Sequence, residues 1–232
     1  MNEPLLLLPG MMCDARLFAP QIAAFSATRA VMTAPLAGRD SIAGLASDIL
    51  AVAPDRFALL GLSMGGIVAM EMIRQAPGRI SRLALLDTNH RAELPDVAAR
   101  RGPQIAKVRD GHLRAVMRDE MKPNYLTDGP NTGAILDLCM AMAETLGDTV
   151  FIQQSLALRQ RPDQTETLRA IAVPSLVLCG ADDTLCPPQR HQEMHALIPG
   201  ANLRVIDNAG HLPTLEQPEL TNQALTTWLT EP

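Results

Sequence analysis

Short apolar runs alternate along this chain with longer segments of helical character. The strand-like runs are residues 5–8, 29–33, 57–61, 82–86, 174–179 and 202–207, and the helix-like segments lie near 15–26, 41–53, 64–75, 187–197 and 217–229. A strand followed by a helix and then by another strand forms a crossover that leaves the two strands parallel. The alternation therefore predicts an α/β fold, with a mostly parallel sheet of about six strands and helices on both faces.

Residues 91–164 interrupt this alternation, because they contain few strand signals and several helical stretches. We expect them to form a helical cap on a core made of residues 1–90 and 165–232. Such a cap would lie over the strand ends, exclude water and shape a pocket. An apolar stripe at helical spacing within it is expected mainly to pack against the core; its members are Ile135, Leu138, Cys139, Met142 and Leu146.

The pattern Gly-x-Ser-x-Gly occurs between a strand-like run and a helix. It comprises Gly61, Ser63 and Gly65, preceded by the apolar residues 57–60 and followed by the helix-forming residues 67–73. On a tight strand-to-helix turn the serine hydroxyl points away from the sheet, and side chains at the two glycines would collide. The pattern alone is weak, but its setting favours a nucleophile over an idle serine in a glycine-rich turn.

A serine hydroxyl is a poor nucleophile until a base takes its proton, so a histidine and an orienting acid are required. His211 lies in a loop after the strand-like residues 202–206, and Asp183 lies in a loop after residues 175–179. Ser63, Asp183 and His211 would thus meet at the carboxyl ends of three strands, where open α/β sheets build their sites.

With these residues the chain resembles the cofactor-free serine hydrolases of the α/β-hydrolase superfamily, whose catalytic residues occur in the order Ser, Asp, His. The resemblance covers residues 4–90 and 165–228, and it is carried by four motifs at residues 5–11, 61–66, 180–187 and 210–218. It implies a nucleophile elbow at Ser63, with Asp183 and His211 completing a catalytic triad.

The resemblance also places an oxyanion hole at the backbone N–H groups of Met11 and Met64. In many relatives a histidine precedes the first-loop glycine, whereas this chain has Pro9. Proline donates no N–H group, which is expected to alter how this loop is braced.

Other acids and histidines compete for a place in the site. Asp87 ends the strand-like residues 82–86, where some superfamily members carry their acid; its alternative role is a turn or cap. Asp182 is expected to cap or hydrogen-bond the loop that contains Asp183. His191 and His195 are four residues apart on an expected helix, which permits metal binding geometrically, but a solvated helix face is favoured and no metal site is predicted.

The resemblance implies a carboxylic ester hydrolase, a carboxylesterase or enol-lactonase that cleaves a small ester or lactone through an acyl-enzyme on Ser63. Hydrolysis of a carbon–carbon bond, perhydrolysis and lyase chemistry use the same triad, and a non-catalytic member could bind a small ligand. No cofactor is expected. The 12 methionines beside only 3% aromatic residues favour a small aliphatic acyl group over a flat aromatic one.

Composition and charge also limit the classes of partner that the protein could bind. A net charge of −5 and a pI near 5.5, without a basic cluster, argue against nucleic-acid binding. We find neither a secretory signal nor an apolar run of transmembrane length. The four cysteines lack metal-ligand spacing and are expected to be free thiols. The expectation is a cytoplasmic enzyme with a small-molecule substrate and no membrane partner; the sequence makes no prediction of oligomeric state.

Overall fold

The sheet has six strands in the order β2-β1-β3-β4-β5-β6, and every neighbouring pair is parallel. The structure is a computed structural model and describes residues 2–230. The predicted α/β fold class is therefore confirmed. The strands are β1 (Asn2–Leu8), β2 (Arg29–Thr33), β3 (Phe57–Leu62), β4 (Ile80–Leu86), β5 (Ser175–Gly180) and β6 (Asn202–Ile206).

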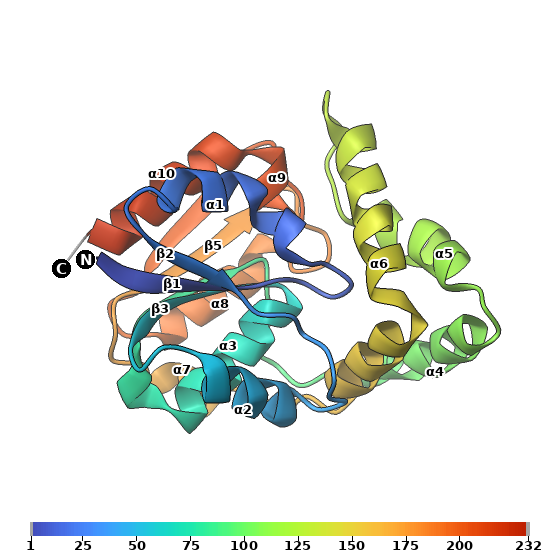
Figure 1. Cartoon of the computed structure of the whole chain (residues 1–232), viewed down its shortest axis with the longest axis horizontal. Coiled ribbons are helices and arrows are strands. Elements are labelled where there is room, and N and C mark those ends of the chain that lie inside the picture. Colours follow the sequence, from blue (N-terminus) through green and yellow to red (C-terminus); the bar gives the residue numbers. More distant parts are fainter. Residues whose placement is uncertain (1, 231–232) are drawn as a thin grey trace.

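Helices cover both faces of this sheet (Figure 1). In β1, Leu6 and Leu8 belong to one buried cluster and Leu5 and Leu7 to the other, because successive strand residues point to opposite faces. Burial on both faces explains why the strands are continuous apolar runs. One layer contains α2 (Ile42–Val52), α3 (Met64–Gln75), α7 (Thr165–Arg169) and α8 (Pro188–Leu197), and the other contains α1 (Ala19–Phe25), α9 (Pro213–Glu216) and α10 (Pro218–Thr230). Short 3₁₀ turns occur at Ala15–Phe18 and Pro77–Arg79.

The segment of residues 95–159, between β4 and α7, is mainly helical and stands beyond the carboxyl ends of the strands (Figure 1). Of the apolar stripe, Ile135, Cys139 and Met142 are buried in one cluster with Leu62 of the sheet, as expected for packing against the core. Within residues 2–230 no helix has the length and apolar character needed to cross a membrane. The elements of this segment are α4 (Pro95–Arg109), α5 (Leu113–Val116), a π-helical turn (Met117–Met121), a 3₁₀ turn (Lys122–Asn124) and α6 (Thr132–Arg159), which is interrupted at Gly147.

Candidate active site

Ser63 occupies the turn between β3 and α3. Its backbone angles, φ 55° and ψ −116°, lie in a region that costs a non-glycine residue about 1–3 kcal/mol. The turn is held on both sides: the Ser63 N–H donates to the Leu86 carbonyl oxygen at 2.9 Å, and the Ser63 carbonyl accepts from the Thr88 hydroxyl at 2.6 Å. The strained conformation is thus fixed by neighbouring strand β4 and the residues that follow it.

The two glycines of the Gly-x-Ser-x-Gly pattern are required by close backbone approach. A Cβ atom on Gly61 would lie 2.3 Å from the Gly65 carbonyl oxygen, and one on Gly65 would lie 2.0 Å from the Leu8 carbonyl oxygen. Real Cβ atoms do not come so close to backbone atoms. A side chain at either position would force β1, β3 and α3 apart and move the serine.

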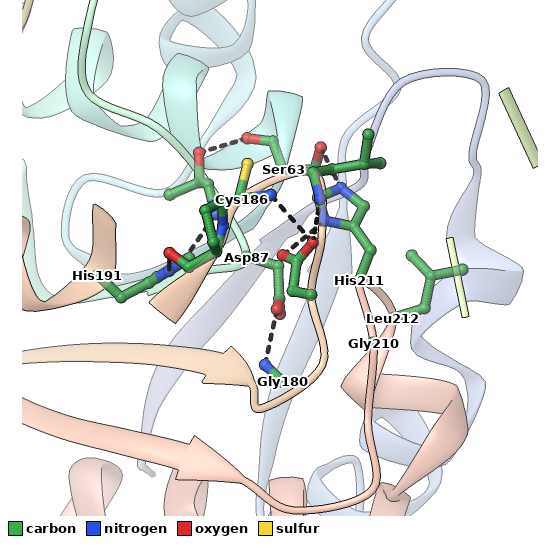
Figure 2. Close-up of polar contacts among 12 residues, drawn as sticks. Ser63, Asp87, Gly180, Cys186, His191, Gly210, His211 and Leu212 are labelled. Carbon is green, nitrogen blue, oxygen red and sulfur yellow. Dashed lines mark hydrogen bonds and ion pairs between the residues drawn. The ribbon is translucent and has the colours of Figure 1, made fainter. Parts of the chain in front are cut away.

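The structure brings Ser63, His211 and Asp183 together although they are distant in sequence. His211 Nε2 lies 2.9 Å from Ser63 Oγ, and His211 Nδ1 lies 2.8 Å from Asp183 Oδ2. Figure 2 shows the serine and the imidazole facing each other at the strand ends. The Asp183 side chain is fully buried and that of His211 is 6% exposed, so both contacts are shielded from water. The arrangement can pass a proton from the hydroxyl to the imidazole.

The Asp183 carboxylate is held in its ionised form. Burial alone would raise its pKa, but the charge of His211, the hydrogen bond to it and two backbone donors together lower the pKa below its ordinary value. The backbone donors are the N–H groups of Leu185 and Cys186, which lie 2.9 and 3.0 Å from Oδ1. An ionised Asp183 keeps a proton on Nδ1 of His211 and leaves Nε2 free to accept one.

Glu216 holds the backbone on both sides of His211. Its carboxylate accepts hydrogen bonds from the N–H groups of Gly210 and Leu212, each at 3.0 Å. The N–H of His211 itself donates to the Tyr125 carbonyl oxygen at 2.7 Å, so the helical segment also fixes this loop. Glu216 lies in the motif 210–218, but its role could not be predicted from the sequence, because the acceptor function appears only once the loop is folded.

Met11 and Met64 are the two residues predicted to form the oxyanion hole. Met64 is the first residue of α3, Met11 follows β1, and both residues line the same cavity as Ser63. The N–H of neighbouring Met12, which has φ 55°, donates to Gln154 Oε1 at 2.8 Å, and Gln154 Nε2 donates to the Leu36 carbonyl oxygen at 2.8 Å. Gln154 on α6 therefore braces the loop that follows Pro9, a contact that sequence reasoning missed.

Asp87 does not reach His211 by any hydrogen bond within the described residues. It is fully buried, its Oδ1 accepts from the Gly180 N–H at 2.9 Å (Figure 2), and its Oδ2 has no donor in the described chain. Burial, and next the negative charge of Asp183, raise the pKa of Asp87 well above its ordinary value. Asp182 is exposed, and its backbone N–H donates to the Ala209 carbonyl oxygen.

The prediction of a solvated helix face was wrong for His191. Its side chain is fully buried, its Nε2 accepts a hydrogen bond from the Thr88 N–H at 3.1 Å, and burial lowers its pKa to about 4. His195, one helical turn further, is exposed as expected. His191 is therefore a neutral core residue that supports the backbone after β4, and its Nε2 is already occupied.

One group of possible metal ligands occurs within residues 2–230, and it overlaps the site just described. It consists of Asp183, Cys186 and His211, whose ligand atoms lie within 4.8 Å of one another. Asp183 and His211 are bonded to each other, and burial raises the pKa of the Cys186 thiol well above its ordinary value. Because two of its three members already bond to each other and lie at Ser63, we assign no metal role to this group. The cysteines are free thiols, as predicted.

A cavity of about 420 Å³ opens at Ser63 and His211. This volume falls within the usual range of small-molecule sites. Residues from the helical segment, including Val97, Tyr125 and Leu158, form part of its wall together with residues of the strand ends. A ligand in this cavity would contact the serine hydroxyl and the helical segment at the same time.

A parallel sheet, a strand–serine–helix turn and a helical insertion over the strand ends define the α/β-hydrolase class of proteins. The sequence pattern described as "Alpha/beta hydrolase family" matches residues 5–224, and the chain belongs to that family.

Known relatives and solved structures agree with this class. The pimeloyl-[acyl-carrier protein] methyl ester esterase of Neisseria meningitidis is 25% identical over 192 residues, which cover 80% of this chain and 74% of that protein. A thermophilic esterase from Thermogutta terrifontis superposes with a TM-score of 0.90 and 28% identity, covering 99% of this chain and 90% of the other. The enol-lactonase of Burkholderia xenovorans LB400 has the same fold, with a TM-score of 0.88, 24% identity and coverage of 100% and 92%.

Proposed function

We propose that this protein is a serine hydrolase that cleaves a small ester or lactone through a covalent acyl-enzyme on Ser63. The observation that carries the proposal is the continuous line of hydrogen bonds from Ser63 Oγ through His211 to Asp183, at 2.9 and 2.8 Å. The cavity at the serine supplies room for a small substrate. The carboxylic ester hydrolases among the relatives, including a methyl ester esterase, support the same reaction class.

In the first half of the reaction, His211 Nε2 takes the proton of Ser63 as Oγ forms a bond to the substrate carbonyl carbon. The carbonyl oxygen becomes an oxyanion, which the N–H groups of Met64 and Met11 stabilise by hydrogen bonding. When this intermediate collapses, the ester C–O bond breaks and Nε2 returns the proton to the leaving alkoxide. The acyl group remains on Ser63.

In the second half, water replaces the alcohol. His211 Nε2 takes a proton from the water molecule, whose oxygen attacks the acyl carbon, and the same two N–H groups hold the second oxyanion. The bond to Ser63 Oγ then breaks, and Nε2 reprotonates the serine. Asp183 stabilises the charged imidazolium that forms twice in each cycle and keeps the ring in its useful tautomer.

Residues 91–164 act in this account as the cap. Their helices supply part of the cavity wall, and the backbone contact of Tyr125 with His211 joins them to the reacting residues. Closing the cavity strengthens the electrostatic interactions inside it, because water is excluded.

A fluorophosphonate probe tests the proposal, since it reacts with serine hydroxyls that a neighbouring base activates. We expect the wild-type protein to be labelled, Ser63→Ala to be unlabelled and Asp183→Asn to be labelled far more slowly. Asp87→Asn is the matched control and should be labelled at nearly the wild-type rate. No label on folded wild-type protein would favour the non-catalytic, ligand-binding alternative.

A panel of p-nitrophenyl esters of increasing acyl length then separates the remaining reactions. An esterase should turn over one or more of these esters. Labelling by the probe without turnover of any short ester would favour the lyase alternative.

A further inference from the structure

The cap side of the cavity contains a cluster of charged residues that the reaction does not use. Glu93 lies just before α4, Arg101 lies on α4, and Arg161 follows α6. The Arg101 guanidinium donates to one oxygen of Glu93, and Arg161 Nη1 lies 3.0 Å from the other. All three side chains are nearly buried, with exposed fractions of 11% for Arg101, 9% for Arg161 and 4% for Glu93. One buried carboxylate thus forms ion pairs with two buried guanidinium groups.

A third cation adds to this imbalance. Arg190, in the first turn of α8, is half-buried, lines the same cavity and forms no ion pair within residues 2–230. Burial is the main cause that lowers the pKa of Arg161, and the positive charges of Arg101 and Arg190 act in the same direction, against the attraction of Glu93. The cluster therefore contains three guanidinium groups and one carboxylate, which pairs with two of them.

The other charged side chains of the cavity wall are already paired outside this cluster. Glu120 lies 2.7 Å from Lys107, and Arg100, whose side chain is 71% exposed, lies 3.5 Å from Asp96. None of these pairs offsets the positive charge of Arg101, Arg161 and Arg190 that exceeds the single negative charge of Glu93. Buried charge without a counter-charge is costly, so an anion that enters this part of the cavity gains a large favourable interaction.

The cluster lies close to the place where a substrate carbonyl would be held. Arg101 Nη1 is 3.9 Å from the Met11 sulfur, and Met11 belongs to the loop of the proposed oxyanion hole. Ser63, Met11 and the three arginines all line one cavity. A short ester can therefore place its carbonyl at Ser63 and a second polar group at the arginines.

We propose that the arginine cluster formed by Arg101, Arg161 and Arg190 binds a carboxylate of the substrate, so that the enzyme prefers esters or lactones that carry a free carboxylate on a short aliphatic chain. This inference rests on the hydrolase function proposed above. Planar guanidinium groups match the two oxygens of a carboxylate with paired hydrogen bonds. The competing role for these residues is a purely structural one, in which Glu93 and the arginines join the two ends of the cap.

The kinetic test uses matched ester pairs. The mono-p-nitrophenyl esters of succinic, glutaric and adipic acid are each compared with the neutral ester in which a carboxamide replaces the carboxylate, and Ser63→Ala protein supplies the rate of spontaneous hydrolysis. For at least one chain length we expect kcat/KM to be about 10- to 100-fold higher for the carboxylate ester, mainly through a lower KM. Added salt should reduce this preference.

Substitutions then assign the preference to the cluster. Arg101→Gln and Arg161→Gln should remove most of this preference, because they lower kcat/KM for the carboxylate ester far more than for the neutral ester, and the corresponding lysine variants should restore part of it. Arg190→Gln should weaken the preference several-fold. Because Arg190 has no ion-pair partner among the described residues, this variant remains informative if the other two fail to fold. Arg100→Gln, on the same wall but paired with Asp96, is the control and should behave as the wild type.

Calorimetric titration of monomethyl glutarate and its carboxamide counterpart into Ser63→Ala protein measures the site without catalysis. Tighter binding of the carboxylate, weakened several-fold in Ser63→Ala/Arg190→Gln, supports the proposal. Equal binding and equal kcat/KM within every pair would overturn it, as would arginine variants that slow both esters equally; the hydrolase function would then still stand. Absence of probe labelling and of all turnover would instead overturn the hydrolase function. In that case the titration by itself would show whether the arginine cluster binds a carboxylate.

Discussion

Gln154 on α6 accepts a hydrogen bond from the backbone N–H of Met12 at 2.8 Å, which ties the cap to the loop of the proposed oxyanion hole. Gln154→Leu removes the acceptor of the Met12 N–H and the donor to the Leu36 carbonyl oxygen. Because both groups are buried, the substitution should lower the free energy of unfolding by about 1–3 kcal/mol. With the loop loosened, kcat for an ester should fall about 10-fold or more at nearly constant KM.

Gln153→Ala is the control for this prediction, because Gln153 also accepts a backbone hydrogen bond, from Gly38 at 3.0 Å, but near the surface. Ester kinetics and urea unfolding of both variants make the comparison. If Gln154→Leu lost stability but kept kcat, Gln154 would support only the fold.

Asp87→Asn should change the pH dependence of stability. The folded-state pKa of Asp87 is raised, so its contribution to the free energy of unfolding is complete below the unfolded pKa near 3.8 and is lost as pH rises through the folded value. Asparagine keeps the acceptor for Gly180 and does not titrate. The variant should therefore gain stability relative to the wild type as pH rises, by up to about 1.4 kcal/mol per pH unit.

Urea unfolding at a series of pH values from 5 to 9 measures this difference. A constant difference between Asp87→Asn and the wild type over that range would contradict a neutral, buried Asp87.

Glu216→Gln should displace His211. The carboxylate accepts from the backbone N–H groups on both sides of the histidine, and an amide nitrogen in place of one oxygen would face those donors without accepting. We expect kcat to fall about 10- to 100-fold, together with the rate of fluorophosphonate labelling, because a small misplacement of the base is costly. Glu219→Gln, on the exposed face of α10, is the control. Equal rates in the two variants would show that the loop holds His211 without Glu216.

Gly65→Ala should abolish the turn that presents Ser63. The added Cβ would lie 2.0 Å from a backbone oxygen of β1, so the variant should lose about 3 kcal/mol or more of stability, and labelling with it. At Gly78 nothing lies within 4 Å of the added atom, and Gly78→Ala should change neither quantity. Thermal unfolding and probe labelling compare the two. A stable, labelled Gly65→Ala protein would contradict the geometry of the turn.

The fold could be predicted because both faces of the sheet are buried, which makes strands such as β3 and β5 recognisable as uninterrupted apolar runs. The predicted strand differs most from the observed one at β1. This strand begins at Asn2 rather than at residue 5, because its first residues are not apolar and so do not resemble a buried strand. Ser63, Asp183 and His211 could be assigned to strand ends in the same way, and the structure brings them within hydrogen-bond distance. Their catalytic roles stay predictions until they are tested.

What the sequence could not reveal depends on contacts between distant segments. His191 is buried because α8 packs against the sheet, and its partner, the backbone N–H of Thr88, lies beside it only in the folded chain. Gln154 and Arg101 lie in helices whose sequence pattern gives no reason to single them out. Their partners come from the loop after β1 and from the start of the cap, so only the tertiary arrangement reveals them.

The most direct test of the central claim is mass spectrometry of the protein quenched with acid during turnover of a p-nitrophenyl ester. We predict a mass increase equal to the acyl group on the peptide that contains Ser63, and no such adduct in Ser63→Ala protein. An unmodified Ser63 peptide, with ester hydrolysis that persists in Ser63→Ala, would contradict it.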